Sequence, residues 1–340
     1  MVGFDDGRLD DEDVLVRFDA LLRHQAEAGS RVRREALAAE PAVAEAVADL
    51  AVVRPRAVLA AGPDSRLLRA VLEPVCPVPF VAWPHPHLPA WVGNLDLVVV
   101  LAPNGDDQDT ARAVAEAVRR GASVVVACPE RSLVSEYVTG RHSTMLPVTT
   151  GDPLATAVAM LEVLDRLGLG PRTSPEVVAT ALDDVAVACS PHRDLAVNPA
   201  KGLAIALADT TPLLWGGTVL AARAARRIAE ALRRATGRAV LAGDAEHLLP
   251  ILERSTLPDV FADPFIESGQ ELRPALVVLD DGFGDEAVAA TRRELIATAD
   301  GRGVRVELID SEAEGDVARY AAMMATGTYA AAYLRVGHLP

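Results

Sequence analysis

The sequence contains one local pattern twice, and this repetition is its strongest constraint on the fold. Residues Leu95–Thr110 and Pro274–Glu286 each join an apolar run of strand length to a short loop that combines glycine with aspartate. A helical pattern follows each loop, and a further strand-like run follows each helix. Such strand–helix–strand units join parallel strands by right-handed crossovers. The repetition therefore predicts loops gathered at the carboxyl ends of parallel strands, where α/β folds bind ligands.

The elements around the two copies share one plan, in which a strand, a small-residue turn, a helix and a strand come first. We therefore expect an α/β fold of two doubly wound parallel-sheet subdomains, related by internal duplication, with flanking N- and C-terminal helices. The expected segments are an N-terminal helical segment at 1–50, a first subdomain at 51–170 and a second at 171–340. Strands are expected at 56–61, 78–81, 97–101 and 123–127, and again at 212–215, 238–241, 276–279 and 304–309.

Three further elements are expected from local signals. Pro41 should interrupt the N-terminal helical pattern, because proline removes a backbone donor inside a helix. Residues 259–269 should form an ordered loop anchored by Phe261 and Phe265. The final helix, at 316–336, is apolar on most faces, so we expect it to pack between the domains or across a subunit interface.

Charge and composition limit the partners of the chain. The formal net charge of -15 would repel a nucleic-acid duplex or an anionic membrane, so we expect neither as a partner. Aromatic residues make up only 4% of the chain whereas 50% is apolar, which favours helices packed on a parallel sheet through Ala, Val and Leu. The acidic N-terminus has no signal core, and no apolar stretch reaches the roughly 18 residues of a membrane span. We expect a soluble, cytoplasmic protein.

The three cysteines, Cys76, Cys128 and Cys189, lie far apart in the sequence. No pair has zinc-type spacing, and an odd number argues against a disulfide framework. We expect free thiols in a reducing compartment. His85 and His87 lack further metal ligands nearby, so we expect no metal.

Several short segments resemble one family. In chain order they are Leu88–Leu97, Arg120–Val125, Asn198–Lys201, Pro212–Gly216 followed by Ala224–Arg227, and Tyr333–Pro340. Together they resemble the sugar isomerase (SIS) domain proteins, and within them the bifunctional phosphoglucose/phosphomannose isomerases. The resemblance implies two SIS-like subdomains in a homodimer, a sugar-phosphate ligand between the halves and no cofactor. The reaction it implies is reversible aldose–ketose isomerisation of glucose-6-phosphate or mannose-6-phosphate with fructose-6-phosphate, through an enediol.

The resemblance also implies where a ligand would bind. Ser65 matches the end of the family's first phosphate turn, and Gly105 and Thr110 match its second loop, Ser-Tyr-Ser-Gly-Asn-Thr-Glu-Glu-Thr. Asp106–Asp107 stand where that loop has Asn-Thr, and their carboxylates would repel a phosphate dianion. These two residues suit either a solvated loop or an amine-bearing ligand. The implied ligand-binding residues are Ser65, Asn104, Gly105, Thr110, Lys201, Gly216, Gly217, Thr218 and Arg226.

Structural explanations compete with ligand binding at three of these residues. Ser65 also suits a cap for a helix that begins at Arg66. Lys201 follows an Asn-Pro helix start, and Arg226 belongs to a basic face of an amphipathic helix. Both explanations remain open for each residue.

The catalytic motifs of the family are not retained. The position of its catalytic Glu is taken by Arg234, which cannot accept a proton near neutral pH. Glu246 and His247 are the nearest acid/base candidates, but neighbours on a helix point in different directions, and a solvated helix start is the alternative.

Three functions follow from this pattern. The first is a carbohydrate-derivative-binding or regulatory protein with little or no isomerase activity. The second is a non-enzymatic scaffold or regulatory partner of a sugar-nucleotide pathway enzyme. The third is an active isomerase that uses Glu246 and His247.

Overall fold

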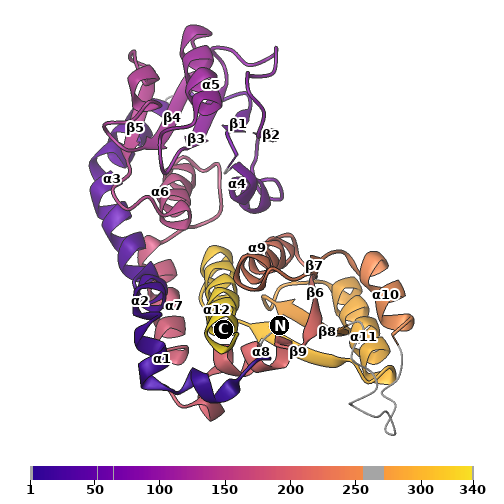
Figure 1. The fold of residues 1–340 in the computed structure, drawn as a ribbon. Helices are drawn as coiled ribbons and strands as arrows, with labels where there is room; N and C mark the ends of the chain where they lie inside the picture. The colour runs from indigo at the N-terminus through magenta and orange to yellow at the C-terminus, as the bar shows by residue number, and fades with distance from the viewer. Residues whose placement is uncertain (1–2, 52, 64, 256–271, 339–340) are drawn as a thin grey trace, which may run out of the picture. The chain divides into compact units, whose positions relative to one another are not determined.

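The computed structural model describes residues 3–51, 53–63, 65–255 and 272–338 (Figure 1). The chain divides into two compact units. Residues 28–180 form the first, here called the N-terminal unit, and residues 1–27 with 181–340 form the second, the C-terminal unit. The beginning of the chain therefore groups with its end. The loop expected at 259–269 lies outside the described residues.

The N-terminal unit contains a parallel five-stranded sheet in the order β2-β1-β3-β4-β5. Its interior is aliphatic, and β3 is buried along its whole length. One face, which includes Leu59, Val98 and Val100, packs against Val114 and Ala117 of α5. The strands are β1 (Val58–Ala61), β2 (Phe80–Trp83), β3 (Leu97–Leu101), β4 (Ser123–Cys128) and β5 (Ser143–Pro147). The helices are α3 (Ala28–Leu50), α4 (Ser65–Leu72), α5 (Gln108–Arg119), η2 (Ser135–Tyr137) and α6 (Pro153–Arg166).

The C-terminal unit contains a parallel four-stranded sheet in the order β7-β6-β8-β9. Leu213, Leu276 and Val278 form part of its core beneath Leu248 of α10 and Leu295 of α11. Its strands are β6 (Thr210–Gly216), β7 (Leu241–Ala242), β8 (Arg273–Asp280) and β9 (Arg305–Asp310). The helices are η1 (Asp6–Leu9), α1 (Glu12–Val16), α2 (Asp19–Ala26), η3 (Leu195–Val197), α8 (Pro199–Leu207), α9 (Val219–Thr236), α10 (Ala245–Glu253), α11 (Glu286–Gly301) and α12 (Asp316–Gly337). Helix α7 (Pro175–Ala188) contains residues of both units.

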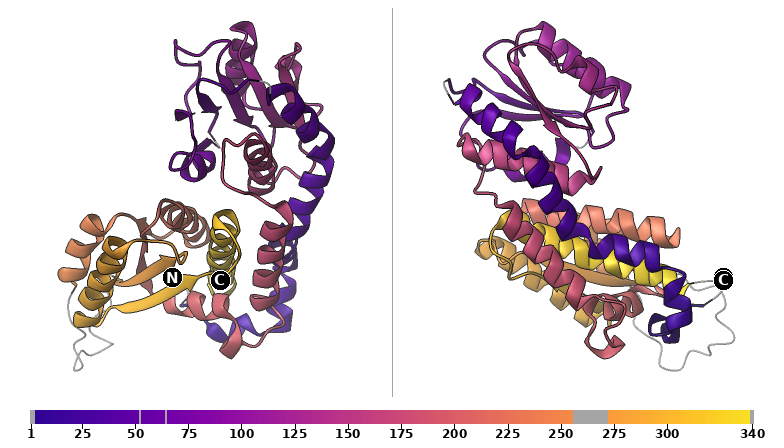
Figure 2. Two further views of the ribbon diagram at one scale, coloured as in Figure 1. Left: turned by 180° about the vertical axis from the view of Figure 1, so that it is seen from behind. Right: turned by 90° about the vertical axis from the view of Figure 1, so that its left-hand side faces the viewer.

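The two sheets share one pattern of strand pairing. Figure 2 shows each of the two units from two further sides. The strands β1, β2, β3 and β4 of the first unit pair in the same order as β6, β7, β8 and β9 of the second, and α4 and α5 correspond to α9 and α11. Helix α10, between β7 and β8, has no counterpart between β2 and β3. Strand β5 extends the first sheet beyond this shared set. The expected doubly wound α/β fold is therefore confirmed.

Two expectations about helices need correction. Pro41 does not end the N-terminal helix, because α3 runs through it from Ala28 to Leu50. The pattern that begins at Asp13 is instead divided earlier, into α1, α2 and α3. Helix α12 is buried inside the C-terminal unit, where it packs on α8 and α9, so its apolar faces need no second domain or subunit to cover them.

Some strand positions also differ from those expected. The strand expected at 78–81 lies at Phe80–Trp83, and the strand expected at 238–241 is the short β7 at Leu241–Ala242. Among the described residues, no helix is both long enough and apolar enough to span a membrane.

Candidate functional site

Each sheet has one point at which the strand order reverses, and the loops that follow the two strands there form the candidate sites. In the N-terminal unit these strands are β1 and β3, and in the C-terminal unit they are β6 and β8. Open α/β sheets bind ligands at the carboxyl ends of the strands at such a point. Seven of the predicted site residues lie in or next to these loops: Ser65, Asn104, Gly105 and Thr110 in the first unit, and Gly216, Gly217 and Thr218 in the second.

In the first unit, Asp107 occupies the N-terminus of α5. It is the N-cap residue of that helix, and its Oδ2 accepts a hydrogen bond from the Thr110 backbone N at 2.7 Å. The Thr110 hydroxyl donates to the same oxygen. A helix N-terminus carries a partial positive charge and unsatisfied N–H groups that attract anions. Here a carboxylate of the chain itself accepts from one of these N–H groups, that of Thr110.

The turn after β1 passes close to Thr110. Gly62 has a φ of +90°, and a Cβ there would lie 3.3 Å from the Thr110 Oγ1, so glycine suits both the conformation and the space. Ser65 begins α4 and is fully buried. Its hydroxyl has no hydrogen-bond partner among the described residues. The structure thus shows no capping bond from the Ser65 hydroxyl among the described residues, and its ligand role stays a prediction.

A small pocket of about 170 Å³ opens beside this turn. Asp107, Asp109 and Thr110 from α5 and its N-terminus line it, together with Gly62 and His85. Two carboxylates in so small a space give the pocket a negative character, which disfavours a phosphate group.

Asn104 and Gly105 have different surroundings. Asn104 is exposed, whereas Gly105 is buried with a φ of +70°. A Cβ on Gly105 would overlap the Ser132 side chain. This packing gives Gly105 a structural reason to be glycine, independent of any ligand.

The equivalent loops of the C-terminal unit are joined by a buried aspartate. Thr218 caps α9 by accepting from the Ala221 backbone N at 3.1 Å, and its hydroxyl donates to the Asp281 carboxylate. Asp281 is 4% exposed. A Cβ on Gly216 would overlap the backbone of Ala221, and one on Gly217 would overlap Val288. Both glycines are therefore required by packing, and the Thr218 hydroxyl is bonded inside the protein.

Arg319 of α12 contacts two residues of the loop that follows β8. Its guanidinium donates to the Asp281 carbonyl oxygen at 2.5 Å and lies 4.5 Å from the centre of the Phe283 ring. Asp285 caps α11 through the Val288 backbone N at 3.0 Å, as Asp107 caps α5 in the first unit. Neither Asp281 nor Arg319 was singled out as a site residue in the sequence; an aspartate directly after a buried strand was the only local signal.

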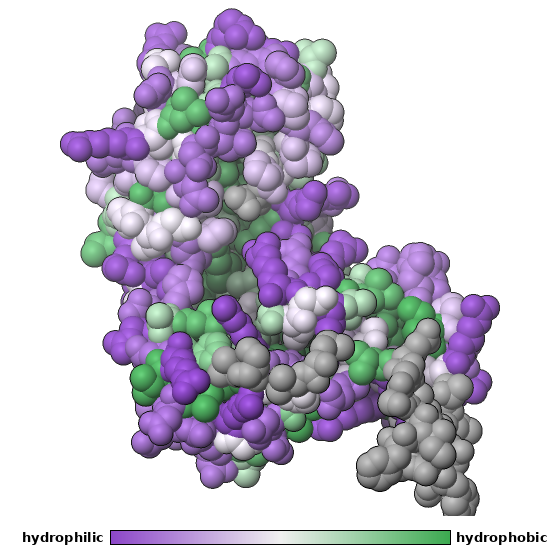
Figure 3. All heavy atoms as spheres, viewed as in Figure 1, coloured by the Kyte–Doolittle hydropathy of each residue, from purple (hydrophilic) through white to green (hydrophobic). Residues whose placement is uncertain are grey.

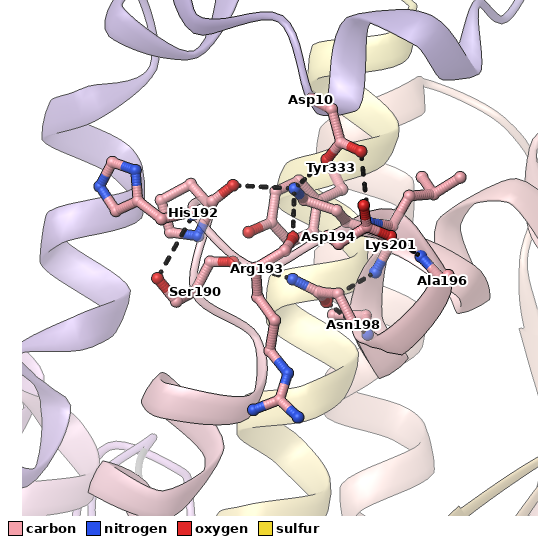
Figure 4. Close-up of polar contacts among 12 residues, drawn as sticks. Asp10, Ser190, His192, Arg193, Asp194, Ala196, Asn198, Lys201 and Tyr333 are labelled. Carbon is pink, nitrogen blue, oxygen red and sulfur yellow. Dashed lines mark hydrogen bonds and ion pairs between the residues drawn. The ribbon is translucent and has the colours of Figure 1, made fainter.

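Lys201 lies in a closed polar cluster shown in Figure 4. Its Nζ donates to the Asp10 Oδ1 at 2.6 Å, the Pro191 carbonyl oxygen at 2.8 Å and the Arg193 carbonyl oxygen at 2.9 Å. The side chain is fully buried, and its ammonium lies 5.5 Å from the centre of the Tyr333 ring. An ammonium has three N–H donors, and all three are used here. This geometry favours the structural explanation of Lys201.

The helix start around Lys201 also forms as its sequence indicates. Asn198 caps α8 by accepting from the backbone N atoms of Ala200 and Lys201, each at 3.1 Å, and Pro199 occupies the first turn. Arg226 is an exposed residue of α9. Its ligand-binding role stays a prediction.

Glu246 and His247 lie in the first turn of α10, on the surface. Their side chains are 78% and 66% exposed, and a carboxylate oxygen of Glu246 lies 3.8 Å from the His247 Nδ1. Asp244 brings a third potential ligand atom within 4.8 Å of these two. The adjacent residues thus approach each other more closely than their helix positions suggested. Their exposure favours the solvated helix start, and a catalytic role stays a prediction.

The comparisons with known proteins agree with the fold. No curated protein sequence matches the chain. The family model described as the bacterial phospho-glucose isomerase C-terminal SIS domain matches residues 196–338. The crystal structure of tagatose-6-phosphate ketose/aldose isomerase from Escherichia coli is similar, with a TM-score of 0.64 and 14% identity, over 94% of this chain and 93% of that chain.

Two further solved structures are similar. The C-terminal domain of glucosamine-fructose-6-phosphate aminotransferase from Francisella tularensis has a TM-score of 0.63 and 12% identity, over 93% of this chain and 95% of that chain. A glucose-6-phosphate isomerase like protein from Thermus thermophilus has a TM-score of 0.50 and 17% identity, over 89% of this chain and 91% of that chain. An aminotransferase domain and isomerases share this fold, so the fold alone does not identify the reaction. Residues 196–338 are thus similar to a SIS domain, and the chain has the doubly wound α/β fold of solved phosphosugar isomerases.

Proposed function

We propose that this protein binds a carbohydrate derivative at the loops after β1 and β3 and does not catalyse aldose–ketose isomerisation. The observation that carries the proposal is the Asp107 carboxylate, which bonds to both the backbone N–H and the hydroxyl of Thr110. In α/β folds these are the kinds of donor that hold a phosphate. The Asp107 carboxylate takes the place of the phosphate. We therefore expect the ligand to be an unphosphorylated or amine-bearing sugar.

The residues at the expected catalytic positions support the loss of isomerase activity. Isomerisation needs a base with an available lone pair. Arg234, which stands at the position of the family's catalytic Glu, lies exposed near the end of α9. Glu246 and His247 are exposed to solvent, where no enclosed surface excludes water from them.

Thermal-shift titration tests the ligand class. Glucose-6-phosphate, mannose-6-phosphate, fructose-6-phosphate and glucosamine-6-phosphate are compared with the unphosphorylated sugars, including glucosamine. A ligand at about a hundred times its dissociation constant stabilises a protein by ~2.7 kcal/mol. We expect a shift with an unphosphorylated sugar and none with the phosphates. Isomerase turnover at the rate of a working enzyme would contradict the proposal. If none of the sugars gives a thermal shift, the proposal of sugar binding is also wrong and binding to a protein partner is the remaining function.

A single substitution tests the role of Asp107 directly. Asp107→Thr keeps a side-chain oxygen that can cap α5, and removes the negative charge. We expect this variant to gain a thermal shift with glucose-6-phosphate that the unchanged protein lacks. Asp285→Thr is the matched control, because Asp285 caps α11 at the equivalent position of the other unit. An equal gain in both variants, or none in Asp107→Thr, argues against an internal anion at the site.

The homodimer implied by the resemblance belongs to this proposal. Light scattering on the purified chain measures the oligomeric state, with and without the sugar that gives a shift.

A further inference from the structure

A large pocket lies at the opposite edge of the second sheet from its candidate loops. It has a volume of about 730 Å³ and is built around the amino ends of β6 and β8 and the residues that precede β9. The parallel register brings these ends together, since Thr210 pairs with Arg273 and Ala275 pairs with Arg305. Ligand pockets have volumes of roughly 300–1,000 Å³. The pocket is therefore of a size that holds a complete small molecule.

Four arginines line this pocket. They are Arg238, Arg254, Arg273 and Arg302, and no aspartate or glutamate is among the described residues of the lining. Arg254, Arg273 and Arg302 are exposed, and within the described part of the chain their guanidinium groups make no hydrogen bond or ion pair. Arg238 donates to the Ala208 carbonyl oxygen, and its other nitrogen lies 4.0 Å from the Asp209 carboxylate.

Helix ends explain only part of this cluster. Arg254 and Arg302 follow the last turns of α10 and α11, where a cation complements the negative end of the helix dipole. Arg238 likewise follows Gly237, the C-cap of α9. The dipole therefore leaves only Arg273, which opens a strand, without such a reason to be basic. Four like charges around one hollow repel one another. In a chain with a net charge of -15, this concentration of positive charge calls for an anion.

The walls between the arginines are apolar. Pro250 and Ile251 of α10, Leu272 and Pro274 beside β8, and Val304 line the pocket. On the face seen in Figure 3, apolar residues lie beside hydrophilic ones in the region of α10. Arginine binds phosphate oxygens in a bidentate manner and stacks on flat rings. An organic anion with both phosphate groups and an apolar ring system would use all of these surfaces.

We propose that this arginine pocket binds a nucleoside di- or triphosphate. The phosphates contact Arg254, Arg273 and Arg302, and the base packs against the apolar wall of α10. The site is separate from the carbohydrate-binding loops of the proposed function, because its lining residues belong to the C-terminal unit and those loops belong to the N-terminal unit.

Isothermal titration of the full-length protein with ATP, in low salt without divalent metal, tests the proposal. Tripolyphosphate and adenosine are titrated in parallel, because they carry the anionic and apolar parts separately. We expect ATP to bind more tightly than either. Each of Arg254→Gln, Arg273→Gln and Arg302→Gln should weaken ATP binding about tenfold, the effect of losing one charge-assisted hydrogen bond. Arg335→Gln is the control, since Arg335 is an exposed arginine of α12 outside the pocket.

Hydrogen exchange on the unchanged protein gives a second readout that does not depend on variants. ATP should increase protection at residues 238–240 and 302–304 and leave 62–65 unchanged. No binding of ATP at millimolar concentration, or equal weakening by Arg335→Gln, overturns the proposal. Binding of tripolyphosphate as tight as that of ATP overturns the assignment to a nucleotide and leaves an inorganic polyphosphate site.

Discussion

Lys201 is the only lysine in the chain, and it is completely buried. Lysine is among the residues least often found inside proteins, and a buried ammonium is tolerated only when it is paired and fully hydrogen-bonded. Asp10 supplies the charge, and two carbonyl oxygens of the loop after α7 supply the remaining acceptors. The Lys201 cluster therefore ties the first residues of the chain to the C-terminal unit.

The Lys201 cluster gives a stability prediction with a pH signature. Lys201→Met should lower the free energy of unfolding by roughly 3 kcal/mol, because it leaves buried acceptors unpaired. The hydrogen bond from Lys201 lowers the pKa of Asp10 below its usual 3.8. The stabilisation is therefore complete above that value and is lost as the pH falls through the lowered pKa. Denaturant unfolding of the unchanged protein and of Lys201→Met measures this effect. The difference between their free energies of unfolding should become smaller as the pH is lowered.

Arg335→Met on the exposed side of α12 controls for the loss of a positive charge, and should change stability by less than about 0.5 kcal/mol. A difference between the unchanged protein and Lys201→Met that stays constant down to the acid transition would show that Asp10 is not the relevant partner.

The cysteines give a second prediction at the residue scale. Burial raises the pKa of the Cys128 thiol to about 11 and that of Cys189 to about 12. The thiolate is the form that reacts with alkylating reagents, so both residues should be inert in the folded protein. Cys76 is partly exposed. Iodoacetamide treatment followed by peptide mass spectrometry should label Cys76 alone, and label all three after denaturation. Labelling of Cys189 at the same rate as Cys76 would contradict its burial.

At the scale of single elements, four N-terminal caps were not predicted from the sequence, although each of them is a local feature. Asp107, Asp152, Thr218 and Asp285 each accept a hydrogen bond from the first turn of a helix. A cap depends on residues within one turn, so local sequence is sufficient to find it. The predicted helix break at Pro41 was wrong. Helix α3 continues through Pro41 and packs on α6 and β5. Tertiary packing along a long helix outweighs the loss of one backbone hydrogen bond.

Replacing Pro41 tests this explanation. Pro41 is exposed, so Pro41→Ala removes no buried contact and restores a backbone donor inside α3. Alanine is about 3 kcal/mol better than proline in a helix interior, and part of that difference should appear as a rise of roughly 1–3 kcal/mol in stability. Denaturant unfolding measures it, with exposed Ala44→Gly as the opposite change. An unchanged or lower stability in Pro41→Ala would mean that the helix already accommodates proline without loss.

For the whole molecule, the duplication is the feature that organises both fold and site. The two sheets share one pattern of strand pairing, yet their candidate loops differ in chemistry. The first pair of loops surrounds a small acidic pocket, whereas the second is closed by Asp281, Thr218 and Arg319. Among the described candidate loops, only the pair in the N-terminal unit therefore leaves a pocket open to a ligand.

The sequence alone determined the parallel α/β fold, the repetition and the positions of the loops, because buried aliphatic strands, helical periodicity and glycine turns are local signals. It also showed that Asp107 and Arg234 replace residues the resemblance required. Only the tertiary structure decided what those residues contact. The bond from Thr218 to Asp281 and the one from Lys201 to Asp10 join residues far apart in the chain. Such pairings depend on how the elements pack, and no periodicity or spacing encodes them.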